Sequence, residues 1–237
     1  MSDGQAIRTA RAAKRTEALV ADAHPEWERL ALAIRRQVEA CVELDTANAD
    51  VAALADAAEA LAGRLEEGAT GKRVGLVEEG WRGRPEDDRL DYLPFSPIMG
   101  RLNPASYGLS IRREGDRAVA RVVLTETEEG AVGLAHGGVI AGIWDEVLAA
   151  ANSVAETGGP TALLTIRYRK PTPLHEPLVY TAWVERISDR KILVKGECAL
   201  ESAPDEVLTE AEGLFIAFVQ ASIDWHGDRE RENVSTD

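Results

Sequence analysis

The stretch His136–Glu146, with the sequence HGGVIAGIWDE, decides the fold of this chain. A histidine and two glycines come first, then apolar residues on nearly every side of a predicted helix, then two adjacent carboxylates, Asp145 and Glu146. Apolar residues continue to Ala151, and a helix that is apolar all round is buried. A buried carboxylate is unfavourable unless it is paired, hydrogen-bonded or protonated. This stretch therefore contains an acid where stability alone would not place one.

Strand signals flank this helix on both sides. Gly158, Gly159 and Pro160 end the helix, and turn residues near Gly115 and Asp189 separate neighbouring strands. The predicted strands are 108–113 and 118–124 before the helix, and 161–170, 176–188, 190–201 and 206–220 after it. Two strands, one buried helix and four strands predict an α+β fold in which an antiparallel sheet wraps around a long central helix.

A helical segment precedes this domain. Residues 6–67 are predicted to be helical, because apolar residues recur at steps of three and four in two successive stripes. The two stripes predict a hairpin that packs on the domain or on another subunit. The predicted units are an N-terminal helical segment (1–75), a linking loop (76–107), the α+β domain (108–222) and a flexible tail (223–237). The loop is interpreted either as cover for a pocket mouth or as plain packing.

The charge balance argues against nucleic acid and anionic membranes as main partners. The chain has 27 basic and 41 acidic residues and a net charge of −14, which repels polyanions. A DNA-binding role for residues 1–75 is disfavoured for the same reason, because this segment has ten basic and thirteen acidic residues. Two cysteines far apart in sequence give no disulfide framework or metal spacing. With no signal peptide in the N-terminal sequence, we expect a cytoplasmic protein.

Two features together resemble a known family. The His-Gly-Gly of residues 136–138 is followed, nine residues after His136, by the acid Asp145, and the segment 164–174 reads LTIRYRKPTPL. In these residues the chain resembles the hotdog-fold thioesterases of the phenylacetate-degradation (PaaI-like) type. The resemblance covers roughly residues 95–220. It implies the hotdog fold, with the antiparallel sheet wrapped around the central helix.

The resemblance also implies roles for the residues of the motif. Asp145 would activate water or attack the thioester directly, and the backbone N–H of Gly137 would polarise the thioester carbonyl. Free N–H groups at a helix start suit a developing negative oxygen, and glycine at 137 and 138 lets a substrate approach the backbone. His136 would either orient the turn or bond to the thioester oxygen. Glu146 lies about 100° further round the helix, so we expect it at an interface or in solvent.

The chain departs from part of the family at Gly130, where some members have an Asn whose amide supports the site. Some members also place a Ser or Thr on the strand after the helix to hold the attacking water. Thr161 and Thr165 are the candidates here, and a regular strand would put both on one face. The remaining candidates form a basic patch, Arg167, Arg169 and Lys170, which suits the phosphates of coenzyme A or simply a solvated strand end.

The resemblance implies hydrolysis of an acyl-CoA thioester to a carboxylic acid and free CoA. No metal or redox cofactor is implied, since coenzyme A is part of the substrate. The expected assembly is a homodimer or a dimer of dimers with active sites at the subunit interface. Two alternatives remain open: an acyl-CoA-binding sensor that does not hydrolyse its ligand, and a hotdog hydratase. The hydratase usually needs an Asp/His pair at a different spacing.

Overall fold

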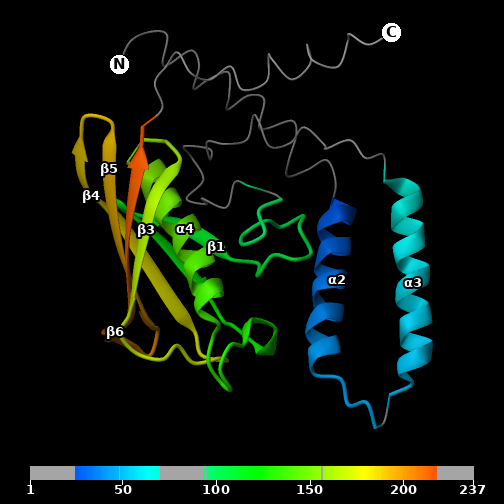
Figure 1. Cartoon of the computed structure of the whole chain (residues 1–237). Helices are drawn as coiled ribbons and strands as arrows, with labels where there is room; N and C mark the ends of the chain where they lie inside the picture. Colours follow the sequence, from blue (N-terminus) through cyan, green and yellow to red (C-terminus); the bar gives the residue numbers. More distant parts are fainter. Residues whose placement is uncertain (1–24, 48, 70–92, 94, 156, 218–237) are drawn as a thin grey trace, which may run out of the picture.

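The computed structural model describes residues 25–47, 49–69, 93, 95–155 and 157–217. Predictions for residues 6–24, for 76–92 of the linking loop and for the tail 223–237 therefore fall outside the described residues. The described part contains an antiparallel sheet, one helix packed on it, and two further helices beside them (Figure 1). The predicted α+β arrangement of two strands, a long helix and four strands is confirmed.

The six strands form one antiparallel sheet in the order β1-β2-β4-β5-β6-β3. Their bounds are β1 Ser110–Glu114, β2 Arg117–Val122, β3 Thr161–Tyr168, β4 Leu178–Ser188, β5 Lys191–Leu200 and β6 Ala203–Ile216. Strand β3, which follows the central helix, lies at the edge of the sheet opposite β1 and pairs with β6. The predicted strand 206–220 begins earlier than expected, because Ala203 already pairs with Leu200 across a tight turn.

The central helix α4, Gly137–Val154, lies across the sheet and buries half of its residues. Ile143, Trp144, Val147 and Leu148 are completely buried, and burying an aliphatic side chain of this size contributes roughly 1.5–3 kcal/mol. The indole N–H of Trp144 donates to the Thr209 hydroxyl at 3.0 Å. The apolar character of this helix is therefore explained by contact with one face of the sheet.

Trp144 fits closely against the strand beneath it. A Cβ atom on Gly196 of β5 would lie 2.4 Å from the Trp144 ring, so only glycine leaves room for the indole at this crossing. The ring also meets Tyr180 of β4 edge-on, with centroids 5.0 Å apart, an arrangement that aromatic pairs favour. These contacts fix the position of α4 on the sheet, and with it the position of the neighbouring Asp145.

The two N-terminal helices differ in how they pack. Helix α2, Pro25–Val42, contacts the domain at several points: Ala31 is buried, the Trp27 ring lies 5.3 Å from that of Phe95, and Arg35 donates to the Asn103 carbonyl at 3.0 Å. Helix α3, Val51–Gly68, has no buried residue and lies on the far side of α2 from the sheet (Figure 1). The apolar stripe predicted on α3 is therefore not covered by the described part of this chain. No described helix is long and apolar enough to cross a membrane.

Candidate active site

His136 forms the start of helix α4 and folds back onto it. Its ring nitrogen Nδ1 accepts a hydrogen bond from the N–H of Gly138 at 3.0 Å, which makes His136 the N-cap. The N–H of Gly137, the first helical residue, makes no hydrogen bond within the described part of the chain. Such a free N–H at a helix N-terminus attracts a negative or partly negative oxygen.

This turn is too tight for side chains at two of its glycines. A Cβ atom on Gly138 would lie 3.0 Å from Nδ1 of His136, and one on Gly130 would lie 2.8 Å from the His136 Cα. A contact below 3 Å with backbone requires the chain to move, so Gly130 lies where a larger residue could not. The departure from the family at this position thus has a steric reason in the packing of this loop.

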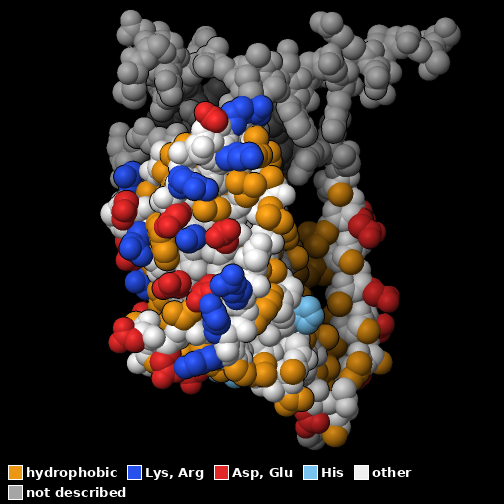
Figure 2. Space-filling view, turned by 60° about the vertical axis from the view of Figure 1, so that its left-hand side comes forward, with side chains coloured by type: hydrophobic (Ala, Val, Ile, Leu, Met, Phe, Trp, Pro, Cys, Tyr) orange, Lys and Arg blue, Asp and Glu red, His pale blue; other side chains and the backbone are white. Residues whose placement is uncertain are grey.

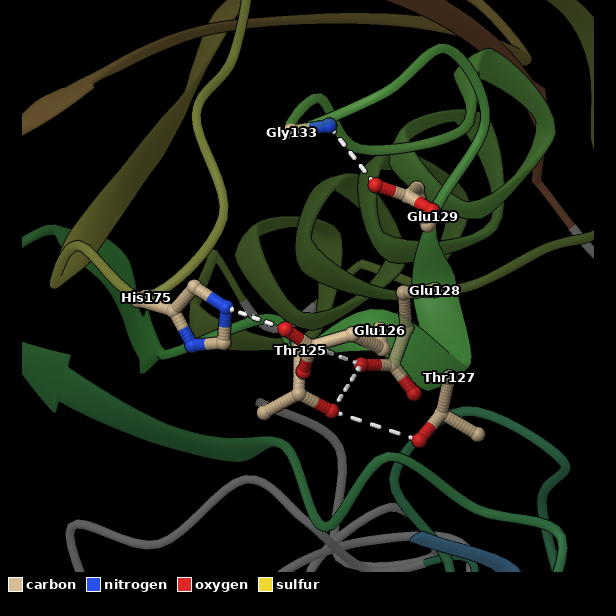
Figure 3. A network of polar contacts seen from close by, with 7 residues as sticks. All are labelled: Thr125, Glu126, Thr127, Glu128, Glu129, Gly133 and His175. Carbon is tan, nitrogen blue, oxygen red and sulfur yellow. Dashed lines mark hydrogen bonds and ion pairs between the residues drawn. The ribbon is translucent and has the colours of Figure 1, made fainter. Parts of the chain in front are cut away.

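A network of carboxylates supports the loop before His136 (Figure 3). The buried Glu128 accepts from the Thr125 backbone N–H at 2.8 Å and from its hydroxyl at 3.2 Å. Its carbonyl accepts from the backbone N–H of His136 at 2.8 Å. Glu129 accepts from the Gly133 N–H at 2.6 Å. Sequence reasoning missed this network, because carboxylates in a loop are ordinarily solvated.

His175 extends the same network from a distant loop. Its Nε2 atom lies 2.8 Å from a carboxylate oxygen of Glu126, in the short 3-10 helix η1, Glu126–Glu128 (Figure 3). The pKa of the Glu126 carboxyl is lowered, first by a hydrogen bond from the backbone and then by His175. The contact joins the loop at His175 to η1, and η1 holds the backbone N–H of His136 through the Glu128 carbonyl.

Asp145 and Thr161 meet beside the central helix. The Thr161 hydroxyl, at the start of β3, donates to Oδ1 of Asp145 at 2.8 Å. Both side chains are exposed in the single chain. The structure therefore places Thr161, one of the two threonines that the sequence offers to hold the attacking water, directly against the candidate base Asp145.

Thr165 does not share this position. A β-bulge between Thr161 and Leu163 shifts the register of β3, so that Thr161 pairs with the buried Phe215 and Thr165 with the exposed Glu212. Paired residues in a sheet point to the same face, and Phe215 points to the helix. The prediction that Thr161 and Thr165 share a face is therefore wrong, because the bulge adds one residue between them.

Glu146 also differs from expectation. Instead of lying at an interface or in solvent, it is half-buried and accepts a hydrogen bond of 2.5 Å from the Ser96 hydroxyl. Burial raises the pKa of the Glu146 carboxyl and nearby Asp145 raises it further, while the bond from Ser96 opposes both. The Ser96 hydroxyl also accepts from the backbone N–H of Ile98 at 3.1 Å. Glu146 thus ties the loop at Ser96 to α4.

A surface cavity of about 530 Å³ opens beside the turn. Its walls come from the loop before α4, the first turn of α4 and the end of β3. They include His136, Gly137, Tyr168, Arg169 and Lys170. Asp145 is not part of the lining, because it follows His136 by nine residues, or about 13 Å of helix. The turn and the acid of one chain are thus too far apart to contact one small group together.

The basic patch is largely paired with acids. Arg169 lies 2.8 Å from Glu210, and Lys170 lies 2.7 Å from Glu206; the pKa values of both carboxyls are lowered by these partners. Figure 2 shows basic and acidic side chains interspersed over the sheet side of the molecule. Arg167 is exposed and does not line the cavity. Arg169 and Lys170 are therefore the two cations placed beside the turn.

Comparison with known proteins agrees with this geometry. Residues 132–202, which include α4 and strands β3 to β5, match the family model described as the thioesterase superfamily. The crystal structure of protein RHA08564, a thioesterase superfamily protein, is 30% identical, covers 80% of this chain and 90% of its own, and superposes with a TM-score of 0.70. The chain belongs to the thioesterase superfamily. Its sheet wrapped on a central helix is the hotdog fold of that superfamily.

Two further proteins are similar to part of this chain. Acyl-coenzyme A thioesterase THEM4 from Mus musculus is 38% identical over 89 residues, which is 37% of this chain and 37% of the relative. The chain therefore spans little more than a third of the length of that protein. The E. coli PaaI protein of the phenylacetic acid degradation operon is 18% identical, covers 48% of this chain and 81% of its own, and has a TM-score of 0.44.

Proposed function

We propose that this protein hydrolyses an acyl-CoA thioester to a carboxylic acid and free CoA, in the manner of the phenylacetate-degradation type of hotdog thioesterase. The observation that carries the proposal is the hydrogen bond from Thr161 to Asp145. Asp145 lies on the same helix whose first turn is formed by His136, Gly137 and Gly138. An acid held in place and a free N–H at a helix start are the two elements that thioester hydrolysis requires. The THEM4 relatives, named as acyl-CoA thioesterases, support the same reaction.

The chemistry follows from these two elements. The thioester carbonyl oxygen accepts from the Gly137 N–H, and the developing charge is stabilised by the helix dipole. Asp145 takes a proton from water as the water oxygen attacks the carbonyl carbon, or it attacks that carbon itself and is released by water in a second step. In the first route the C–S bond breaks after water has added, and in the second it breaks when Asp145 forms an anhydride with the acyl group; in both routes the CoA thiolate leaves and takes up a proton. Thr161 holds the Asp145 carboxylate in one orientation throughout.

We infer that two chains form each site. Asp145 is exposed in the single chain and about 12 Å along the helix from Gly137. Strand β3 is an edge of the sheet, and its outward-facing Leu163 is 58% exposed; such an edge suits pairing with a second copy. A twofold axis there would bring the turn of one chain near the acid of the other. A homodimer or a dimer of dimers would contain such sites in pairs.

The CoA moiety would lie along the cavity beside the turn. Arg169 and Lys170 line it together with His136 and Gly137, and their charges would bind phosphate groups once they exchange Glu210 and Glu206 for the ligand. Arg167 is placed on the same strand and would add to the local positive potential. No metal or redox cofactor is needed for this reaction.

An assay of thiol release with a panel of acyl-CoA substrates tests the proposal. We expect turnover with at least one acyl chain, and loss of that turnover in Asp145→Asn. Recovery of intact acyl-CoA after long incubation with saturating protein would instead favour a binding protein that senses acyl-CoA. The steric requirement for Gly130 weakens that alternative, because the missing Asn no longer implies a lost function. Water addition to an enoyl-CoA would identify a hydratase.

A further inference from the structure

The hydroxyl of Tyr168 links the end of strand β3 to the first turn of helix α4. It donates a hydrogen bond of 2.8 Å to the backbone carbonyl of Gly137. A Cβ atom on Gly137 would lie 3.5 Å from this hydroxyl, so the phenol rests directly on that glycine. Tyr168 also lines the cavity beside His136. A surface tyrosine on an edge strand would ordinarily be explained by packing, but this one bonds to the turn that lines the cavity.

The atom that accepts this bond connects Tyr168 to His136. The carbonyl of Gly137 and the N–H of Gly138 belong to one peptide group, in which resonance couples the oxygen to the nitrogen. A hydrogen bond at the oxygen polarises the group and strengthens its N–H as a donor. That N–H donates to Nδ1 of His136 at 3.0 Å. A continuous chain of polarised bonds thus leads from the phenol to the imidazole ring.

This chain determines where the imidazole proton lies. A ring nitrogen that accepts a hydrogen bond has no proton, so a neutral His136 has its proton on Nε2. The Nε2–H group is then a donor available to a ligand in the cavity, close to the free N–H of Gly137. Two donors beside one carbonyl oxygen stabilise a developing oxyanion better than one.

We propose that Tyr168 is a positioning residue that holds His136 as the Nε2–H tautomer through the Gly137–Gly138 peptide, so that His136 becomes the second donor to the thioester oxygen. The proposal rests on the proposed thioesterase function for the role of that donor. The link between Tyr168 and His136 consists of two hydrogen bonds and does not depend on that function.

The tautomer can be read directly in the full-length protein without substrate. The chain has four histidines, so nitrogen–proton correlation spectra of ¹⁵N-histidine-labelled protein at pH 8 are simple to assign with His136→Gln as reference. We expect well-separated Nδ1 and Nε2 shifts for His136 in the wild type, as in a fixed tautomer. In Tyr168→Phe the two shifts should move toward each other as the tautomers mix. Unchanged His136 shifts in this variant would overturn the proposal.

Kinetics supply the second readout. With the acyl-CoA that the wild type turns over fastest, Tyr168→Phe should lower kcat about three- to tenfold, the scale of one hydrogen bond, with KM nearly unchanged. A rise in KM with kcat unchanged would mean that Tyr168 only contacts the ligand, and would overturn the positioning role. Incorporation of 3-fluorotyrosine at position 168 keeps the hydroxyl and should retain wild-type kcat and His136 shifts.

Tyr107→Phe is the matched control. Tyr107 is half-buried and does not line the cavity, so loss of its hydroxyl should change neither the His136 shifts nor kcat. The tautomer is read below the melting temperature, so a destabilised Tyr168→Phe still gives an answer. If the wild type hydrolyses no thioester, the proposed function fails, yet the spectra still decide whether Tyr168 controls His136.

Discussion

The Thr161 hydroxyl lies 2.8 Å from Oδ1 of Asp145 and donates a hydrogen bond to it across 16 positions of sequence. This bond fixes one oxygen of a carboxylate that is exposed in the single chain. The Asp145 carboxylate is thus oriented before substrate arrives, which is the state that a base or nucleophile needs.

Replacing Asp145 by Asn should keep the fold and lower kcat by at least ~10²-fold, the usual effect of removing a positioned base. Thiol release and thermal melting measure the two effects. Glu146→Gln is the matched control, since its carboxylate bonds to Ser96 and not to Thr161. If the Glu146 variant proved the more damaged one, the acid would have been assigned to the wrong residue.

Thr161→Ala should lower kcat about tenfold, because the Asp145 carboxylate would lose the hydroxyl that orients it. Thr165→Ala removes the same group four residues along the strand but from the opposite face, and should leave kcat within about twofold of the wild type on this geometry. Steady-state kinetics of the two variants measure the difference. Equal losses in both variants would contradict the role given to the bulge.

Replacing Arg167, Arg169 and Lys170 together by Ala should raise KM for CoA thioesters. The same variant should leave hydrolysis of a short thioester without the nucleotide nearly unchanged, because the charges bind a remote part of the substrate. Arg112→Ala with Arg113→Ala, on the opposite edge strand β1, is the control for lost positive charge. Equal losses on both substrates would show that the patch supports the fold instead.

Stability should respond to pH through Glu146. Its folded-state pKa is raised above the ordinary 4.5 by burial, so the folded chain binds more protons than the unfolded chain between that value and the raised one. Stability from this group is then lost as the pH rises through the window. Glu146→Gln is neutral at every pH, so its melting temperature should exceed that of the wild type increasingly above pH 4.5. A pH-independent difference would show that the carboxyl stays ionised in the folded chain.

Mixing two inactive variants should restore activity if the site is shared. Gly137→Pro removes the proposed oxyanion N–H at a helix position where proline is favoured, and Asp145→Asn removes the base. After subunit exchange by mild denaturation and refolding, half of the dimers are mixed, and each has one intact site. About a quarter of wild-type activity should return in a twofold dimer. An inactive mixture with demonstrated heterodimers would mean that each chain builds its own site.

The sequence by itself determined the elements and the core. The apolar run from Gly137 onward predicts the buried helix α4, and the predicted strand 176–188 is β4, in which Tyr180 and Ala182 are buried while Val179, Thr181 and Trp183 line a groove on the other face. Periodicity of this kind depends only on backbone geometry and on which side chains avoid water, so it is visible in a single chain. The His-Gly-Gly turn and the acid nine residues later are likewise close together in the sequence, so both can be recognised without knowing the fold.

Only the tertiary structure decided which side chains meet. The bulge that separates Thr161 from Thr165 is a property of two paired strands, and β6 lies far from β3 in sequence. Glu146 finds Ser96 across 50 positions and Tyr168 finds Gly137 across 31, contacts that no local pattern contains. Strand register and side-chain pairing are set by packing of the whole sheet on α4, because a shift of one residue exchanges the buried and exposed faces. The sequence alone therefore indicated which residues form the motif, while folding determined which side chains contact them.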